Sequence, residues 1–508
     1  MAGFKPKWPV EIRFKGVTVI RFNLNGHWVE ESKIDPNWTV LRYLRTKSDH
    51  MAAKEGCAGG DCGACSILIG ERGTQNQIHF KTVNACIALL GSLDGQYVVT
   101  VEGLRDGEQL HPVQQAMVDH HGSQCGFCTP GIISSLAALY HNRHINGEQG
   151  APCEHDIHVA LSGNLCRCTG YRPIIEAAKH MHSYPAPIAS APVMNAGVGI
   201  YEPTDSLNTA ANNTISPSLE HEGRKLFVPD SEDQLKQLLT THPQARLWAG
   251  GTDLGLEITQ QFKQFDTLIS LHKVQALTAI TEDETSLRFG AMVTYSNAEQ
   301  HLTTHFPSFA QLVERIGSRQ VRNLGTLGGN IANASPIGDT PPVFFALNAR
   351  IEVGSAAGHR EVAIEDFVKG YKQTDLKPGE YLRSIVVPKL TSNQMLNVYK
   401  VSKRKEDDIS AVLMATRIEH HDGVIKDVRI ACGGMAATPL RAKHTEATLI
   451  GQSFTLSSFE QAAKRIKDDY QPINDVRATA EYRLMVAANL VIKTGLACLD
   501  EQNQSGGK

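Results

Sequence analysis

Cysteine is the residue type whose number and spacing most directly predict chemistry in this chain. Nine of the eleven cysteines lie between Cys57 and Cys168, and the other two are Cys432 and Cys498. The first residues of the chain lack the apolar stretch of a secretory signal. An odd, clustered set of cysteines in this context favours metal ligation over a framework of disulfide bonds.

A first set of four cysteines has the spacing of a plant-type [2Fe–2S] site: Cys57, Cys62, Cys65 and Cys86. Three sulfurs from one tight loop can point at one cluster, and the fourth arrives from a separate element. The loop is rich in glycine, which permits positive φ and lets backbone N–H groups approach the sulfurs. Structural zinc normally uses two paired knuckles, and Cys86 has no neighbouring partner. Zinc binding and simple core packing remain the alternatives to an iron–sulfur cluster here.

A second set consists of a C-x2-C pair, Cys125 and Cys128, and a C-x-C pair, Cys166 and Cys168. Both pairs lie at the ends of predicted helices, where partial positive charge at a helix N-terminus favours thiolate ligands. Taken alone the pattern also allows zinc, but beside the first set it favours a second cluster. Cys153 lies in the intervening loop and belongs to neither pair.

Two glycine-rich segments further along, 247–255 and 325–330, could approach a diphosphate through backbone amides. Neither has the G-x-G-x-x-G pattern, so the Rossmann fingerprint is absent. On the residues alone, a tight turn without any ligand is an equally good interpretation.

The first hundred residues predict a small β-rich unit around the first set. Strand-like runs at 17–24 and 27–30 flank Asn25-Gly26, the pair most typical of a tight hairpin. Thr39 is placed to cap a helix that follows it. Two more strands are expected, at 66–69 and 97–101.

The second set is expected on helices. One should begin near Pro112, a second should follow an N-cap at Thr129 with Pro130 at its first position, and a third should cover 173–182. Residues 184–222 are rich in Pro, Ser, Ala, Asn and Gly, a composition that predicts a linker or an irregular surface segment.

The rest of the chain is predicted to be mixed α/β. Helices are expected over 231–239 and 297–302 and a strand over 382–387. A strand over 428–431 and a helix over 481–492 suggest a separate C-terminal α+β domain.

Composition narrows the class of protein. At 508 residues the chain should contain several domains. Fifty basic and 53 acidic residues leave a formal charge of −3, which argues against nucleic-acid binding and a polybasic membrane anchor. No apolar run approaches the ~20 residues that span a bilayer. A cytoplasmic location is expected.

Three motifs resemble one known family. EGCAGGDCGACSILI, QCGFCTPG and LSGNLCRCTGYRPI are similar to the N-terminal iron–sulfur part of the xanthine dehydrogenase/molybdenum hydroxylase family, over about 16–178. The resemblance implies that each cysteine set holds one [2Fe–2S] cluster, with the second set nearest a molybdenum centre. It also places Gln124 beside the pterin, where the alternative is an amide that stabilises its own loop.

The two glycine segments resemble the diphosphate-binding stretches of the flavoprotein domain in the same family. This implies FAD binding, with Asp339 at the ribityl or adenosine end and Leu382 and Lys400 near the isoalloxazine. Ile316 stands where the family usually has an aromatic ring. The implied FAD-binding residues are Trp248, Ala249, Gly250, Gly251, Thr252, Asp253, Leu254, Gly255, Ile316, Thr326, Leu327, Gly328, Gly329, Asn330, Asp339, Leu382 and Lys400.

The charged run over 400–409 allows two interpretations. It could be a solvated loop, or, by the resemblance, a loop that governs access of NAD to the flavin. In the second case Asp407 would contact the nicotinamide side.

The expected architecture is multidomain α+β. It comprises a ferredoxin-like β-grasp [2Fe–2S] domain, a four-helix [2Fe–2S] domain, a two-part FAD-binding domain of the vanillyl-alcohol-oxidase-like type and a C-terminal α+β flavoprotein domain. The expected bounds, in that order, are 10–105, 106–183, 223–392 and 393–504, with the linker over 184–222.

The order of the parts resembles the small subunit of bacterial xanthine dehydrogenases. It implies a molybdopterin-binding large subunit as partner, in a heterotetramer of two small and two large subunits. The partner would convert hypoxanthine to xanthine and then urate, while this chain passes electrons through both clusters to FAD and NAD⁺. No catalytic residue is expected on this chain. An aldehyde or N-heterocycle hydroxylase subunit and a cluster-binding redox sensor are the alternatives.

Overall fold

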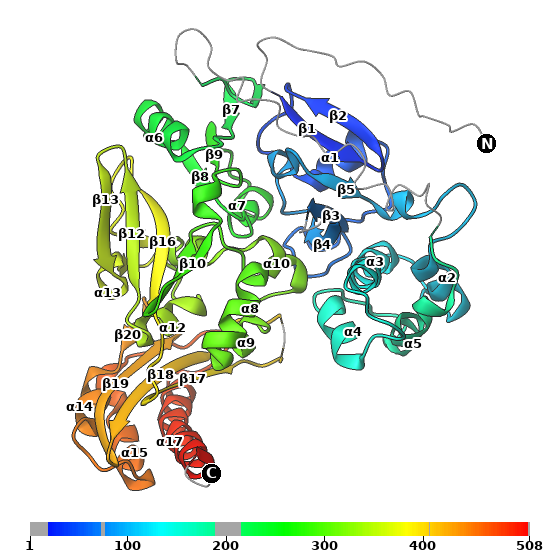
Figure 1. The fold of residues 1–508 in the computed structure, drawn as a ribbon. Helices are drawn as coiled ribbons and strands as arrows, with labels where there is room; N and C mark the ends of the chain where they lie inside the picture. The colour runs from blue at the N-terminus through cyan, green and yellow to red at the C-terminus, as the bar shows by residue number, and fades with distance from the viewer. Residues whose placement is uncertain (1–18, 73–76, 188–214, 406, 506–508) are drawn as a thin grey trace.

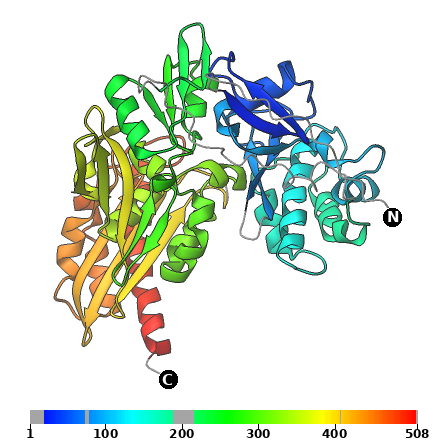
Figure 2. The ribbon, with the colours of Figure 1, turned by 45° about the horizontal axis from the view of Figure 1, so that its top comes forward.

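The computed structural model describes residues 19–72, 77–187, 215–405 and 407–505. The start of the first predicted strand, the first residues of the first predicted domain and most of the predicted linker lie outside these ranges. Figures 1 and 2 show the N-terminal sheet and a group of helices on one side of the molecule. The flavoprotein-like part and the C-terminal part lie on the other side, and α10 (Arg319–Leu324) lies against β4 of the N-terminal part.

The N-terminal part is built on a sheet of strand order β2-β1-β5-β3-β4. The predicted hairpin is confirmed, because β1 and β2 pair antiparallel around Asn25 and Gly26, both at positive φ. Thr39 caps α1 (Val40–Thr46), its hydroxyl accepting from Arg42 N at 3.2 Å. The strand predicted to reach residue 101 ends at Val99. The strands are β1 (Ile20–Leu24), β2 (His27–Glu31), β3 (Ser66–Arg72), β4 (Ile78–Asn84) and β5 (Tyr97–Val99).

The helical part packs around one apolar core. The helices are α2 (Pro112–Asp119), α3 (Thr129–Ile145), α4 (Glu154–Leu161) and α5 (Arg172–His180). The prediction of Thr129 as an N-cap was wrong, because Cys128 is the N-cap and Thr129 is the first helical residue. The Thr129 hydroxyl instead bonds to Ser123 Oγ at 2.7 Å. Helix α4 was not predicted.

Residues from 219 onwards begin a mixed sheet of order β6-β7-β9-β8. Its strand β6 lies inside the predicted linker, which therefore ends earlier than expected, because these residues pair with β7. The parallel pairs β7–β9 and β8–β9 bring the carboxyl end of β8 to the start of α7. The elements are β6 (Leu219–His221), β7 (Arg224–Phe227), α6 (Glu232–Thr241), β8 (Arg246–Trp248), α7 (Leu254–Thr259) and β9 (Thr267–Ser270).

A second, antiparallel sheet of order β10-β11-β16-β12-β13 completes the flavoprotein-like part. Helices α8, α9 and α12 share its apolar core. The elements are β10 (Ile280–Glu282), β11 (Ser286–Gly290), α8 (Tyr295–His305), α9 (Pro307–Val313), α10, α11 (Leu327–Ala332), α12 (Thr340–Ala346), β12 (Arg350–Ser355), β13 (Gly358–Ala363), α13 (Ile364–Phe367), β14 (Val368–Gly370), β15 (Gln373–Thr374) and β16 (Tyr381–Pro388).

The C-terminal part is a four-stranded sheet, β17-β18-β19-β20, covered by helices. Its last helix, α17, is long and apolar enough over Ala480–Asp500 to cross a membrane. The expectation that no apolar run approaches this length was therefore wrong. Four residues of this helix, Ala487, Leu490, Val491 and Cys498, are buried in the C-terminal core. The elements are β17 (Gln394–Val401), β18 (Val412–His421), β19 (Val424–Gly433), β20 (Leu440–Arg441), α14 (Lys443–Leu449), α15 (Leu456–Ala463), α16 (Ile466–Asp469) and α17 (Ala480–Ser505).

The parts share apolar cores rather than meeting only through polar contacts. Trp248 and Leu268 pack into the core of the N-terminal sheet. Leu413 and Ala431 of the C-terminal sheet pack into the core around α12. Burial of apolar area across these junctions resists relative movement of the parts.

Candidate electron-transfer sites

The first cysteine set is assembled by strand register. Residues Ser66 and Asn84 are paired across β3 and β4, so Cys65 and Cys86 lie side by side next to these strand ends. Both are almost fully buried, whereas Cys57 and Cys62 in the preceding loop are partly buried. The structure thus brings together four sulfurs from a loop and a separate strand end.

The four thiols of this set form a hydrogen-bonded group. Hydrogen bonds from Cys62 and then Cys86 lower the pKa of Cys57, whose sulfur also accepts from the Gly59 amide at 3.3 Å. A bond to Cys86 lowers the pKa of Cys65, and bonds to Cys57 and Cys65 raise the pKa of Cys86. The four sulfurs therefore lie within hydrogen-bonding reach of one another, and a bound metal would displace their protons.

The second set is arranged as two contacting pairs, Cys125 with Cys168 and Cys128 with Cys166. Burial, followed by the bond to Cys166, raises the pKa of Cys128 to about 12. Burial opposes ionisation of Cys166, but bonds from Thr169 outweigh it and lower the Cys166 pKa. A backbone amide at Phe127 and the Cys168 thiol lower the pKa of Cys125.

The two contacting pairs of the second set can be compared with the ligands that a two-iron cluster needs. A [2Fe–2S] cluster takes two thiolates on each iron, which the pairs Cys125–Cys168 and Cys128–Cys166 could supply. Cys153 instead caps α4, its sulfur accepting from Asp156 N at 3.4 Å.

The two cysteine sets touch through the backbone. The Leu165 amide, next to Cys166, donates to the carbonyl oxygen of Cys62 at 3.0 Å. The Asn164 side chain donates to Gly63 O at 3.2 Å. These two hydrogen bonds join the loop of the first set directly to the segment that precedes Cys166.

The first cysteine loop also contacts the flavoprotein-like part. Thr259 Oγ1, at the end of α7, donates to Ala58 O at 2.7 Å. Gln260 Nε2 lies 3.0 Å from both Cys57 O and Ala58 O. The sequence carries no signal for these two residues, because their partners are backbone atoms some 200 residues away in the chain.

The two glycine segments meet in space. A Cβ on Gly250 would collide with the Leu324 carbonyl oxygen, so only glycine allows this approach. Thr326 Oγ1 accepts from Gly329 N at 2.9 Å and orders the second turn. Ala249, Gly251, Thr252, Gly329 and Asn330 remain partly accessible. Two adjoining turns with accessible backbone form a cradle that fits a dinucleotide such as FAD.

Several predicted flavin contacts have other roles in the structure. The side chains of Trp248, Leu254, Leu327 and Leu382 are buried in apolar cores, so these residues could offer a cofactor only their backbone. Ile316 is partly buried beside the core around α12.

Asp339 and Lys400 lie together in a buried polar group. Lys400 Nζ is 2.8 Å from Asp339 Oδ2 and 2.9 Å from Arg315 O, and Ser410 Oγ donates to Asp339 Oδ1 at 2.6 Å. A buried pair with its remaining bonds satisfied avoids the cost of an isolated buried charge. This group joins the start of α12 to β17, and the sequence did not indicate the pairing.

The charged loop 400–409 lies near the first cysteine set. Burial raises the pKa of Asp407 to about 6, and the nearby charge of Asp61 in the cysteine loop adds to the shift. A cavity of about 360 Å³ beside this loop is lined by cationic side chains, among them Arg315, Lys403 and Arg404.

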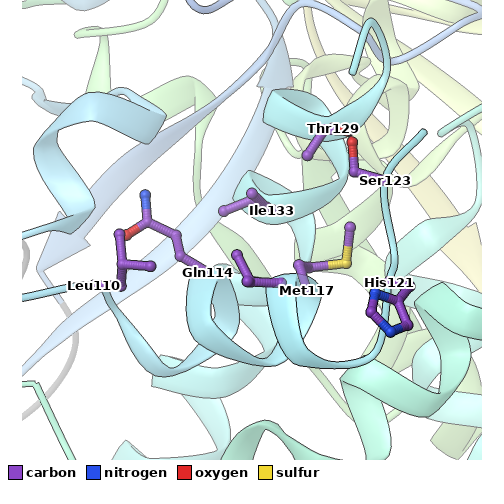
Figure 3. Close-up of a pocket in the computed structure, with 8 residues that line it drawn as sticks. Leu110, Gln114, Met117, His121, Ser123, Thr129 and Ile133 are labelled. Atoms are coloured by element: carbon purple, nitrogen blue, oxygen red, sulfur yellow. Dashed lines mark hydrogen bonds between the residues drawn. The ribbon is translucent and has the colours of Figure 1, made fainter. Parts of the chain in front are cut away.

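The second set is partly exposed to the solvent, because Cys125 and Cys168 are exposed while Cys166 is buried. Gln124, Cys125 and Cys168 are exposed, and Phe127 is 46% exposed. A neighbouring cavity of about 270 Å³ is lined by apolar and polar side chains of α2, α3 and the loop between them (Figure 3). Figure 3 shows Met117 and Ile133 between Gln114 on one side and Ser123 and Thr129 on the other.

Three family models match separate stretches of the chain. Residues 100–179 match a [2Fe-2S] binding domain, and residues 221–390 match the FAD binding domain in molybdopterin dehydrogenase. Residues 397–497 match the CO dehydrogenase flavoprotein C-terminal domain. The chain carries the iron–sulfur and flavin domains of the molybdenum hydroxylase family. The multidomain α+β class is thereby supported, while the detailed fold names stay predictions.

Relatives of this chain include xanthine dehydrogenases. That of Drosophila pseudoobscura pseudoobscura is 33% identical over 540 residues, covering 96% of this chain and 40% of the relative. That of Emericella nidulans is 33% identical over 489 residues, covering 86% of this chain and 35% of the relative. The chain thus spans about two fifths of the length of such relatives.

Solved structures match part of the chain. A chain of carbon monoxide dehydrogenase from Hydrogenophaga pseudoflava superposes with a TM-score of 0.51 and 27% identity, covering 55% of this chain and 96% of the other. A chain of quinoline 2-oxidoreductase from Pseudomonas putida 86 gives 0.50 and 27%, covering 54% and 96%.

Proposed function

We propose that this chain is the iron–sulfur/FAD subunit of a cytoplasmic xanthine dehydrogenase. The observation that carries the proposal is the succession of sites: an exposed cysteine set, a buried set one hydrogen bond away, and the two glycine turns behind it. The direction of flow is taken from the family resemblance.

The chain's residues would divide the work by position. The two cysteine sets would hold the clusters, and the accessible turn residues around Gly251 and Gly329 would hold FAD. When bound, the clusters would carry single electrons and the flavin would collect them in pairs. Thr259 and Gln260 would hold the first cysteine loop against the flavin part.

The exposed face around Gln124 and Cys125 is where we place the partner. A molybdopterin-binding large subunit would dock there and oxidise hypoxanthine to xanthine and xanthine to urate. NAD⁺ would accept electrons at the flavin. Asp407 would contact the nicotinamide side, and the cationic cavity would lie beside it. We propose two small and two large subunits.

The test is to purify the chain with its partner and to measure iron, flavin and xanthine-dependent reduction of NAD⁺. We expect about four irons and one FAD per chain, with flavin bleached by NADH. Iron without flavin would favour a cluster-binding sensor instead and would overturn the proposal.

A second candidate differs only in substrate. The solved relative named quinoline 2-oxidoreductase acts on an N-heterocycle by its name, which favours an N-heterocycle hydroxylase as the alternative. Turnover of an N-heterocycle or an aldehyde, with none of xanthine, would identify this candidate.

A further inference from the structure

Three parts of the molecule meet at one buried carboxamide, that of Gln320 on α10. Its side chain is completely buried. Its Nε2 lies 3.1 Å from Ser66 Oγ, 3.2 Å from Ser135 Oγ and 3.0 Å from Asn164 Oδ1. Ser66 belongs to the N-terminal sheet, and the other two partners belong to the helical part.

Two of the three partners of Gln320 lie close in sequence to a cysteine of one of the sets. Ser66 directly follows Cys65, and Asn164 stands two residues before Cys166. Leu165, which lies between Asn164 and Cys166, donates its backbone N–H to Cys62 O. Gln320 therefore bonds to residues on both sides of the backbone hydrogen bond between Leu165 and Cys62.

The surrounding hydrogen bonds determine which way the amides point. Asn164 Nδ2 donates to the carbonyl of Gly63, so Asn164 Oδ1 must face Ser135 and Gln320. Because Asn164 Oδ1 can only accept a hydrogen bond, the part of the Gln320 carboxamide that faces it must be the NH₂ group. The other polar atom of this side chain, Gln320 Oε1, is buried with no partner among the described residues. Leaving it unpaired costs free energy, which the hydrogen bonds of the NH₂ group offset.

Close backbone packing makes the junction rigid. A Cβ on Gly63 would collide with Gly163 O, and a Cβ on Gly131 would collide with Gly63 O. Because the backbones have no room to slide, the hydrogen bonds of the Gln320 NH₂ group can form in only one arrangement of the three parts.

We propose that Gln320 is a positioning residue for electron transfer between the two cysteine sites. The inference rests on the proposed function, in that both sites hold clusters. One electron leaves the centre held by the second set and enters the centre held by the first. The first is reduced and the second oxidised by one unit, and no bond is made or broken. Gln320 touches neither centre and acts by setting their separation.

The test compares two variants of the same helix in the full chain. Gln320→Leu removes the donor, while Asn323→Leu removes another buried amide, which donates to Thr82 O at 2.8 Å and reaches no residue of the helical part. Iron and flavin content, the reduction potential of each cluster, the spin–spin splitting between the reduced clusters and the rate of their equilibration after flash reduction are measured.

For Gln320→Leu we expect equilibration to slow severalfold and the splitting to weaken, because the rate of electron tunnelling and the spin–spin coupling both fall as the two centres move apart. Iron content and both potentials should stay at the wild-type values. Asn323→Leu should leave the rate and the splitting unchanged. An unchanged rate in Gln320→Leu, or an equal loss in Asn323→Leu, overturns the proposal.

A milder variant covers the case in which Gln320→Leu does not fold. Ser135→Ala removes the hydroxyl that Gln320 and Asn164 share and should slow equilibration by a smaller factor in the same direction. No slowing in this variant would then count against Gln320. Absence of clusters from the wild-type chain would defeat the proposed function itself, a result that the iron assay separates from the other outcomes.

Discussion

The two cysteine sites differ in how far the protein encloses them. The first is held by paired strands, with Cys65 and Cys86 1% and 2% exposed, and is covered by α7 of the flavoprotein-like part. The second has two exposed cysteines, Cys125 and Cys168, on an open face. A buried centre exchanges electrons only within the chain, whereas an exposed one can meet a partner. The difference indicates that the second site is accessible to a partner, whereas the first is enclosed by the chain itself.

The largest expected effect comes from removing one ligand of a site. Cys86→Ser should abolish the first cluster and leave the second, lowering iron from about four to about two per chain. Cys125→Ser should do the reverse, and EPR should distinguish the two remaining signals. Cys153→Ser is the control, because that exposed thiol only caps a helix. Loss of iron in the control would show that cysteine 153 had been assigned the wrong role.

Chelation should reveal the difference in enclosure directly. We expect a chelator to bleach the second site severalfold faster than the first, since Cys125 and Cys168 are accessible without any opening of the fold. The time course of each EPR signal measures this. Equal rates would mean that both sites open together and that the contrast in burial has no consequence.

Forcing the two cysteine sites apart should lower the unfolding free energy of the protein. Gly131→Ala places a methyl group against the Gly63 carbonyl, and we expect it to cost about 1–3 kcal/mol of unfolding free energy. Urea denaturation measures the loss. Gly59→Ala, whose added Cβ would find only ordinary contacts of 3.5 Å or more, is the matched control in the cysteine loop and should cost much less.

The smallest effect concerns a carboxyl near the buried site. Because the pKa of Asp407 is raised to about 6, the folded chain holds a proton there that the unfolded chain has lost, so stability falls as pH rises from about 4 to 6. Asp61 adds to the shift, while Arg404, Arg322 and Lys400 oppose it. Asp407→Asn should flatten this dependence by about 1 kcal/mol, measured by urea denaturation at each pH. An unchanged slope would mean that Asp407 titrates normally.

The sequence predicted well wherever the evidence was local. The Asn25-Gly26 hairpin and the Thr39 cap follow from conformational preferences of single residues and were confirmed. Local evidence failed at Thr129, where the preceding Cys128 takes the cap position because its loop must reach Cys166. It failed again at Leu219–His221, which form a strand only because β7 lies beside them.

By itself, the sequence determined the two sets of four cysteines, their glycine-rich surroundings and the family to which they point, because ligand spacing is written along the chain. Only the tertiary structure decided which set is enclosed and which is exposed, that Asp339 pairs with Lys400, and that Gln320 joins three parts of the molecule. Those contacts join residues 61 to 254 positions apart. No local pattern encodes a partner at such a separation, since the partner is chosen by how the cores pack together.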